Sequence, residues 1–127
     1  MEALTYLDTH VVAWLYAGET HLLSPRARSV IERSTLLISP MVVLELEFLE
    51  EIGRLGVGGQ TIVANLRARI GIEICDLSFS TIVTSARELT WTRDPFDRII
   101  VGHAAAANRP LLTKDRSIRR RFREAIW

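Results

Sequence analysis

Short apolar runs alternate along the chain with longer segments in which apolar residues recur at helical spacing. The runs are bounded by turn and capping residues, as buried strands typically are, and they cover residues 4–7, 36–38, 72–77, 110–113 and 125–127. Helices are predicted between them, several opened by Ser or Asp and a following Pro, over residues 10–16, 25–33, 40–52, 61–70, 79–89, 94–107 and 116–122. This alternation predicts an α/β fold, a three-layer α/β/α sandwich with a central, mainly parallel β-sheet.

Acidic residues follow the predicted strands at corresponding places, either at the end of a strand or early in the next helix. They are Asp8, Glu45, Asp94, Asp97 and Asp115. In an open parallel sheet these positions gather at the carboxyl edge, where ligands bind. Several carboxylates in one site raise each other's pKa unless a cation compensates them, and the oxygen-seeking Mg²⁺ and Mn²⁺ are the natural partners. The sequence therefore predicts a metal-dependent phosphoryl-transfer site.

Glu45 is the strongest single indication because it lies on the apolar side of its helix. At about 100° per residue, it falls in line with Met41, Phe48, Leu49 and Ile52. A carboxylate on an apolar face costs several kcal/mol unless its charge is compensated. A metal ion is one compensation, and a structural ion pair with an arginine is the alternative.

Asp97 presents the same conflict, since it falls in line with the apolar residues of the following turns, Ile100, Val101 and Ala104. The alternative is a capping box, in which Asp94 caps the helix and Asp97 bonds back to it. Capping explains Asp94 better than Asp97, because the next two turns draw that face into the core.

Asp8 and Asp115 each stand between a strand and a helix, where a lone aspartate is most often only an N-cap. Their convergence with Glu45 and Asp97 favours metal binding. Thr9 and Thr113 are placed to orient these carboxylates or a metal-bound water. His10 comes directly after Asp8 and Thr9, and two roles are open for it: contact with the substrate, or packing against neighbouring side chains.

The length of 127 residues predicts one domain, residues 1–127. A single cysteine, Cys75, excludes an intramolecular disulfide and suits a reducing compartment. The N-terminus does not resemble a secretory signal, and the most apolar helix, residues 99–107, is too short to span a bilayer. We expect a cytoplasmic protein with no membrane association.

The formal net charge is only +1, but the positive charge is uneven. Lys114 is the only lysine, and arginines crowd the end of the chain at positions 116, 119, 120, 121 and 123. A basic segment beside an acidic pocket suits a polyanion such as RNA, although a solvated helix face explains it equally well. Trp91 and Trp127 are open to three roles: core, interface or base stacking.

These motifs together resemble PIN-domain ribonucleases, and among them the VapC-type toxins of toxin–antitoxin pairs. The resemblance covers essentially the whole chain. Four motifs carry it: residues 6–10 with 14–15, Ser39 followed by Glu45 and Leu46, residues 94–98, and residues 112–115. The most specific of the four is the Asp94-Pro95-Phe96-Asp97-Arg98 segment. Gly102 and His103 depart from the family pattern without affecting a ligand position.

The resemblance implies a Mg²⁺- or Mn²⁺-dependent endoribonuclease that cleaves RNA with a metal-activated water. Asp8, Glu45, Asp97 and Asp115 would be the catalytic, metal-binding acids, with Asp94, Thr9 and Thr113 as auxiliary residues. Phosphates would be bound by arginines, namely Arg98, Arg116, Arg119 and Arg120. The family also implies a homodimer and a small cognate antitoxin.

Two alternatives remain open from the sequence. One is a non-catalytic RNA-binding or scaffolding module whose acids form buried pairs with arginines. The other is a housekeeping RNA-processing nuclease of the same fold, without an antitoxin.

Overall fold

The computed structural model describes residues 3–127. Its strands are β1 (Ala3–Leu7), β2 (Ser34–Ile38), β3 (Glu73–Ile74), β4 (Leu111–Leu112) and β5 (Ala125–Ile126). Its helices are α1 (Thr9–Ala17), α2 (Pro25–Arg33), α3 (Pro40–Glu51), α4 (Gly59–Ile70), α5 (Phe79–Ala86), α6 (Pro95–Ala107) and α7 (Arg116–Arg121), with a short 3₁₀ turn, η1 (Thr20–Leu22).

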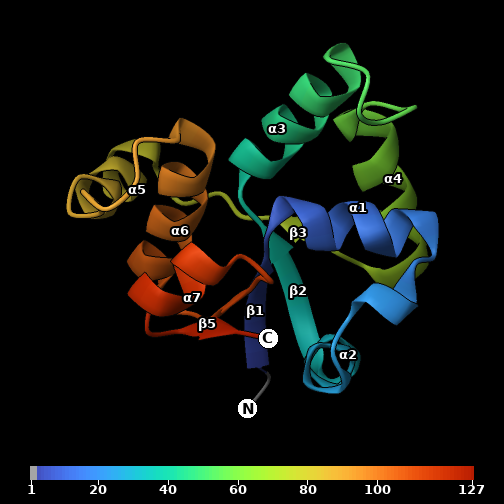
Figure 1. Ribbon diagram of the computed structural model, residues 1–127, viewed down its shortest axis with the longest axis horizontal. Coiled ribbons are helices and arrows are strands. Elements are labelled where there is room, and N and C mark those ends of the chain that lie inside the picture. The colour runs from blue at the N-terminus through green and yellow to red at the C-terminus, as the bar shows by residue number, and fades with distance from the viewer. Residues whose placement is uncertain (1–2) are drawn as a thin grey trace.

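The strands form one five-stranded sheet in the order β3-β2-β1-β4-β5, and every pairing is parallel. Figure 1 shows α5, α6 and α7 on one side of this sheet and α1, α2 and α4 on the other. The predicted three-layer α/β/α sandwich with a parallel sheet is therefore confirmed. Because β1 is the middle strand, the residue that follows it stands at the centre of the carboxyl edge.

The third strand is shorter than the predicted 72–77, and its position in the sheet explains why. β3 is an edge strand that pairs only with β2. β2 ends at Ile38, and the next residue, Ser39, already caps α3. The last contact between the two segments is the hydrogen bond from the N–H of Cys75 to the carbonyl of Ile38. No partner backbone is left for residues 76–77, so the strand ends.

The fourth helix begins at Gly59, two residues before the predicted start at Thr61. Its first turn is stabilised from another helix, since the Glu47 carboxylate of α3 accepts the N–H of Gln60 at 2.9 Å. Local sequence gives no sign of this cap, because no side chain of the preceding residue provides it.

The core lies on both faces of the central strand, with Leu7 of β1, Val12 of α1 and Val101 of α6 fully buried. In α3 the fully buried residues are Val42 and Leu46, whereas on the side that carries Glu45 the Met41 side chain packs against the core and Phe48 is 42% exposed. Among the described residues, no helix is both long and apolar enough to cross a bilayer.

Candidate functional site

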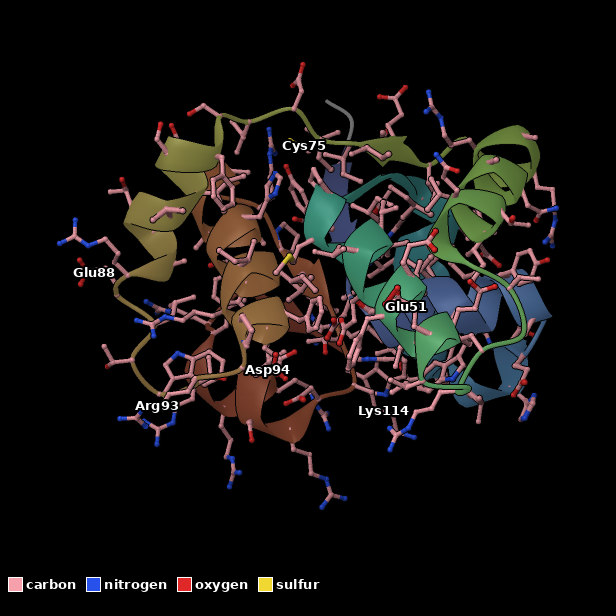
Figure 2. The ribbon with its side chains drawn as sticks, turned by 90° about the horizontal axis from the view of Figure 1, so that it is seen from above. Glu51, Cys75, Glu88, Arg93, Asp94 and Lys114 are labelled. Atoms are coloured by element: carbon pink, nitrogen blue, oxygen red, sulfur yellow. The ribbon has the colours of Figure 1, made fainter. Side chains whose placement is uncertain are left out.

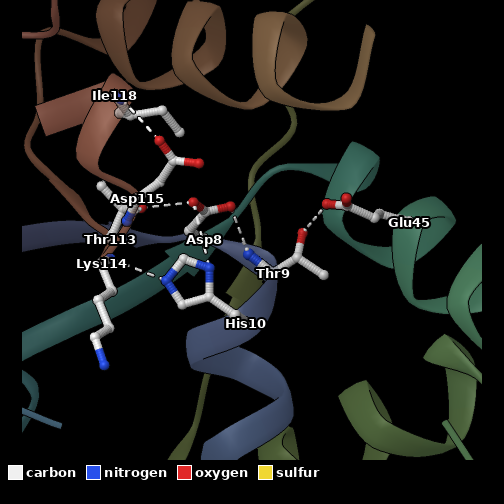
Figure 3. A network of polar contacts seen from close by, with 8 residues as sticks. All are labelled: Asp8, Thr9, His10, Glu45, Thr113, Lys114, Asp115 and Ile118. Carbon is white, nitrogen blue, oxygen red and sulfur yellow. Dashed lines mark hydrogen bonds and ion pairs between the residues drawn. The ribbon is translucent and has the colours of Figure 1, made fainter. Parts of the chain in front are cut away.

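Asp8 stands at the end of β1 and is the N-cap of α1. It is only 4% exposed. Its Oδ1 accepts the N–H of Thr9 at 2.8 Å, and its Oδ2 accepts the hydroxyl of Thr113 at 2.7 Å (Figure 3). The carboxylate is thus fixed by one donor from its own helix and one from the end of β4, 105 positions later in the sequence.

Asp115 is joined to Asp8 through the same threonine. The N–H of Asp115 donates to Thr113 Oγ1 at 3.0 Å, while the Thr113 hydroxyl donates to Asp8. Asp115 Oδ1 accepts the N–H of Ile118 at 2.9 Å and so caps α7. Capping therefore accounts for one oxygen of Asp115, and Thr113 connects the two acids at the carboxyl edge (Figure 3).

His10 connects the start of α1 to the turn before α7. Its Nε2 accepts the N–H of Lys114 at 2.9 Å, and its Nδ1 lies 3.7 Å from Asp8 Oδ2. An imidazole that accepts at Nε2 carries its proton on Nδ1, which here faces the Asp8 carboxylate. Burial lowers the pKa of His10 despite the opposing charge of Asp8, which favours this neutral form. Sequence reasoning missed this contact, because it joins residues 104 positions apart.

Glu45 reaches the site from α3, where its Oε1 accepts the hydroxyl of Thr9 in a short hydrogen bond (Figure 3). Burial, followed by the charges of Asp8 and Asp94, raises the pKa of Glu45, and the Thr9 hydrogen bond opposes the shift. Within residues 3–127, no arginine lies at ion-pair distance from this carboxylate. The structural ion pair with an arginine, considered above, is therefore absent from this part of the chain.

Asp94 and Asp97 occupy the start of α6, and only half of the predicted capping box forms. Asp94 Oδ1 accepts the N–H groups of Phe96 and Asp97 at 2.9 and 3.4 Å. The N–H of Asp94 donates to Thr92 Oγ1 at 3.2 Å instead of to the Asp97 carboxylate. Capping thus explains Asp94 and leaves the Asp97 side chain to another role.

The electrostatics of Asp97 indicate that the acids share one region. Burial first, and then the negative charges of Asp8, Asp94, Asp115 and Glu45, raise its pKa from 3.8 to about 7. Each of these charges acts only over a short range in a protein surrounded by salt solution. Three carboxylates from other segments, those of Asp8, Glu45 and Asp115, and that of Asp94 on the same helix therefore lie close enough to Asp97 to disfavour its ionised form.

The donor chemistry fits a hard divalent cation, although the side chains do not form a closed ligand set. Among residues 3–127, no three acid, histidine or cysteine side chains are grouped closely enough to hold an ion. Asp8, Glu45 and Asp115 are each hydrogen-bonded to protein N–H or O–H groups. Carboxylate oxygens with mutually raised pKa values are nevertheless the ligands that Mg²⁺ and Mn²⁺ prefer.

A sequence model of the PIN domain matches residues 5–123, nearly the whole chain. The chain belongs to the PIN-domain family. A similar fold occurs in a chain of the VapBC2 complex from Rickettsia felis bound to a promoter DNA fragment, with a TM-score of 0.64, 20% identity and 92% of each chain covered. A chain of a toxin–antitoxin complex from Klebsiella pneumoniae matches with a TM-score of 0.65, 18% identity, and coverage of 99% of this chain and 97% of that one. A chain of VapBC-1 from nontypeable Haemophilus influenzae matches with a TM-score of 0.58, 16% identity, and coverage of 98% of this chain and 96% of that one. No curated protein sequence matches.

The predicted RNA-binding arginines of this PIN domain fall into two groups. Arg98 is partly buried, and its guanidinium donates to the carbonyls of Ala86 at 2.9 Å and Arg87 at 3.1 Å, at the end of α5. This contact ties α5 to α6 and accounts for the residue without RNA. Arg116, Arg119 and Arg120 are exposed on α7, directly after Asp115.

Proposed function

We propose that this PIN domain, residues 1–127, is a Mg²⁺- or Mn²⁺-dependent endoribonuclease that acts as the toxin of a toxin–antitoxin pair. The observation that carries the proposal is the convergence of four carboxylates on Asp97, whose pKa they and burial raise to about 7. Such a cluster is costly without a cation, and a position at the carboxyl edge of a parallel sheet, where ligands bind in such sheets, supports the proposal.

Asp8, Glu45, Asp97 and Asp115 are the residues that would hold the cation. The chemistry supplied by bound Mg²⁺ or Mn²⁺ is to make water available as a nucleophile near neutral pH and to stabilise the leaving oxygen of the phosphodiester. The protein's own part is orientation. Thr113 and the N–H of Thr9 fix both oxygens of Asp8, and Thr9 also directs Glu45 through its hydroxyl.

Because its pKa is raised to about 7, Asp97 holds a proton more readily than an ordinary aspartate does, and it would release that proton when positive charge enters the cluster. The exposed arginines of α7 are placed to bind phosphates of the RNA strand, because guanidinium groups pair with phosphate oxygens in a two-pronged geometry. Auxiliary Asp94 maintains the start of α6 on which Asp97 lies.

The partner proposals rest on the chemistry of two surfaces. A carboxylate cluster is a receptor for an arginine guanidinium, so an antitoxin segment that inserts an arginine would displace the cation. Similar folds in VapBC toxin–antitoxin complexes support this partner. A homodimer is proposed on α3, where apolar side chains are exposed, namely Leu44 at 56%, Phe48 at 42% and Ile52 at 49%.

The non-catalytic alternative loses its main support, because its buried acid–arginine pairs are not found among residues 3–127. A housekeeping nuclease remains the alternative role for the same chemistry. Genomic context separates the two roles, since a toxin gene is expected beside the gene of a small binding protein.

The deciding experiment is cleavage of RNA by purified protein, with the fragment ends sequenced. Because water is the proposed nucleophile, fragments should carry 5′-phosphate and 3′-hydroxyl ends, and EDTA should stop the reaction. Asp8→Asn should be inactive and remain folded, and Glu88→Gln, an exposed acid at the end of α5, is the matched control. Fragments with 2′,3′-cyclic phosphate ends, or full activity in EDTA, would rule out the proposed mechanism.

A further inference from the structure

A recess of about 520 Å³ opens between α7 and the segment that joins α5 to α6. It is lined by Trp91, Ser117, Arg120 and Arg121. Figure 2 shows Arg93 and Asp94, which follow Trp91 closely in the sequence, beside α7. The volume is within the range of pockets that hold small ligands.

The lining combines one aromatic ring with two unpaired positive charges. Trp91 packs partly against the core, so one part of its indole is held in place while another faces the recess. Arg120 and Arg121 are exposed, and within residues 3–127 neither lies at ion-pair distance from a carboxylate. No acidic residue lines the recess. Two adjacent guanidiniums repel each other, and a bound anion would relieve that repulsion.

The walls of the recess continue directly into the acid cluster. Trp91 precedes Asp94 by three residues, and Asp94 caps the helix that carries Asp97. On the other side, Arg120 lies five residues after Asp115, about 7.5 Å further along α7 at the helical rise. A strand with one phosphate at the acids therefore has a neighbouring part within reach of the recess.

We infer that this recess binds one nucleotide of a single-stranded RNA next to the cleaved phosphodiester. Trp91 stacks on the base, Arg120 and Arg121 bind the adjoining phosphates, and the Ser117 hydroxyl supplies a further hydrogen-bonding group. This inference rests on the proposed nuclease function and names the form of RNA that the enzyme takes. A duplex does not fit, because a paired base cannot present its face to the indole.

The test measures binding separately from cleavage. The affinity of the 127-residue protein for a fluorescein-labelled ten-nucleotide oligoadenylate is measured by fluorescence anisotropy, in EDTA, at several salt concentrations. Trp91→Leu keeps an apolar side chain against the core but removes stacking, and should weaken binding about 5- to 100-fold with an unchanged salt dependence. Trp91→Phe keeps an aromatic ring and should restore most of the affinity.

Replacing the arginines, unlike replacing Trp91, should change the salt dependence of binding. Arg120→Gln with Arg121→Gln removes two phosphate contacts, so the slope of log K against log salt should fall in magnitude by about 1.4, at about 0.7 for each contact on a single strand. The matched control is Arg26→Gln with Arg33→Gln, which makes the same change in net charge on exposed positions of α2. An equal loss of affinity and slope in this control would overturn the inference in favour of general attraction to RNA.

The outcome also separates this inference from the proposed function. If the wild type cleaves RNA but Trp91→Leu and the Arg120/Arg121 variant bind oligoadenylate as the wild type does, the recess is not a subsite and the nuclease proposal stands. If the wild type neither cleaves nor binds RNA in any metal condition, both proposals fail. Equal affinity for the single strand and for its duplex with oligouridylate would also overturn the inference.

Discussion

Replacing Asp97 by asparagine should stabilise the protein in the absence of divalent metal while abolishing nuclease activity. The amide has nearly the shape of the carboxylate and no charge. In the folded protein, burial and the neighbouring acids disfavour the ionised form of Asp97 and raise its pKa from 3.8 to about 7. The variant removes that unfavourable interaction.

The size of the effect follows from the pKa difference. A shift of about three units corresponds to roughly 4 kcal/mol at 1.36 kcal/mol per unit. Asp97 is only partly buried, so solvent screening lowers this figure, and we expect about 2 kcal/mol at pH 8. The folded pKa lies above the unfolded one, so the wild-type protein loses stability as the pH rises from about 4 to 7. The gain in Asp97→Asn should therefore be small near pH 4 and reach its full value by pH 8.

Urea unfolding in EDTA at pH 4 and pH 8 measures this difference. Glu88→Gln serves as control, because Glu88 is exposed on the far side of α5 in Figure 2 and its loss should change stability little at either pH. A destabilised Asp97→Asn, or a gain that does not grow with pH, would show that the carboxylate has a favourable structural partner and that the reasoning is wrong.

Three further changes test other parts of the structure. His103→Leu should raise the free energy of unfolding by about 1–3 kcal/mol, because the imidazole is fully buried and neither ring nitrogen has a hydrogen-bond partner among the described residues. Burial also lowers the pKa of His103, so the wild-type protein should lose stability as the pH falls below about 6.5. Thermal melts at pH 5.5 and 7.5 should show a smaller loss of stability at the lower pH in His103→Leu than in the wild type. Thr113→Val should lower metal affinity or kcat about 10- to 100-fold, with Thr113→Ser close to wild type, because the hydroxyl joins Asp8 to Asp115. Mg²⁺ at 100 times its Kd should add about 2.7 kcal/mol to the wild type and much less to Asp97→Asn, and calorimetry in two buffers should detect proton release at pH 7.

Local sequence signals were sufficient for most of the fold. Ser24, Ser39 and Ser78 each cap a helix at the predicted place, and Gly18 and Gly71 end helices with the left-handed backbone that glycine favours. These signals lie within a few residues of the features they determine, so a single sequence reveals them. The parallel sheet followed from the alternation of elements.

The errors arose where a distant segment decides the structure. β3 ends early because β2 has turned away, and α4 begins early because Glu47 of α3 caps it. Periodicity put Glu45 and Phe48 on one apolar side of α3, whereas the residues that α3 buries completely are Val42 and Leu46. Helical periodicity identifies a stripe of apolar residues but does not distinguish one that faces the core from one that faces outward.

The central position of β1 has a consequence for the order in which the protein is made and folds. Asp8 is synthesised well before the group that fixes its Oδ2, because that hydroxyl belongs to Thr113, 105 positions later. At about 5–20 residues per second, Asp8 waits roughly 5 to 20 s for this partner to be synthesised. The strand that leads to Thr113 pairs with β1 on one side and β5 on the other, and the closure of such long-range pairings is entropically costly. Until β4 has docked against β1, the chain therefore lacks the Thr113 hydroxyl that joins Asp8 to Asp115.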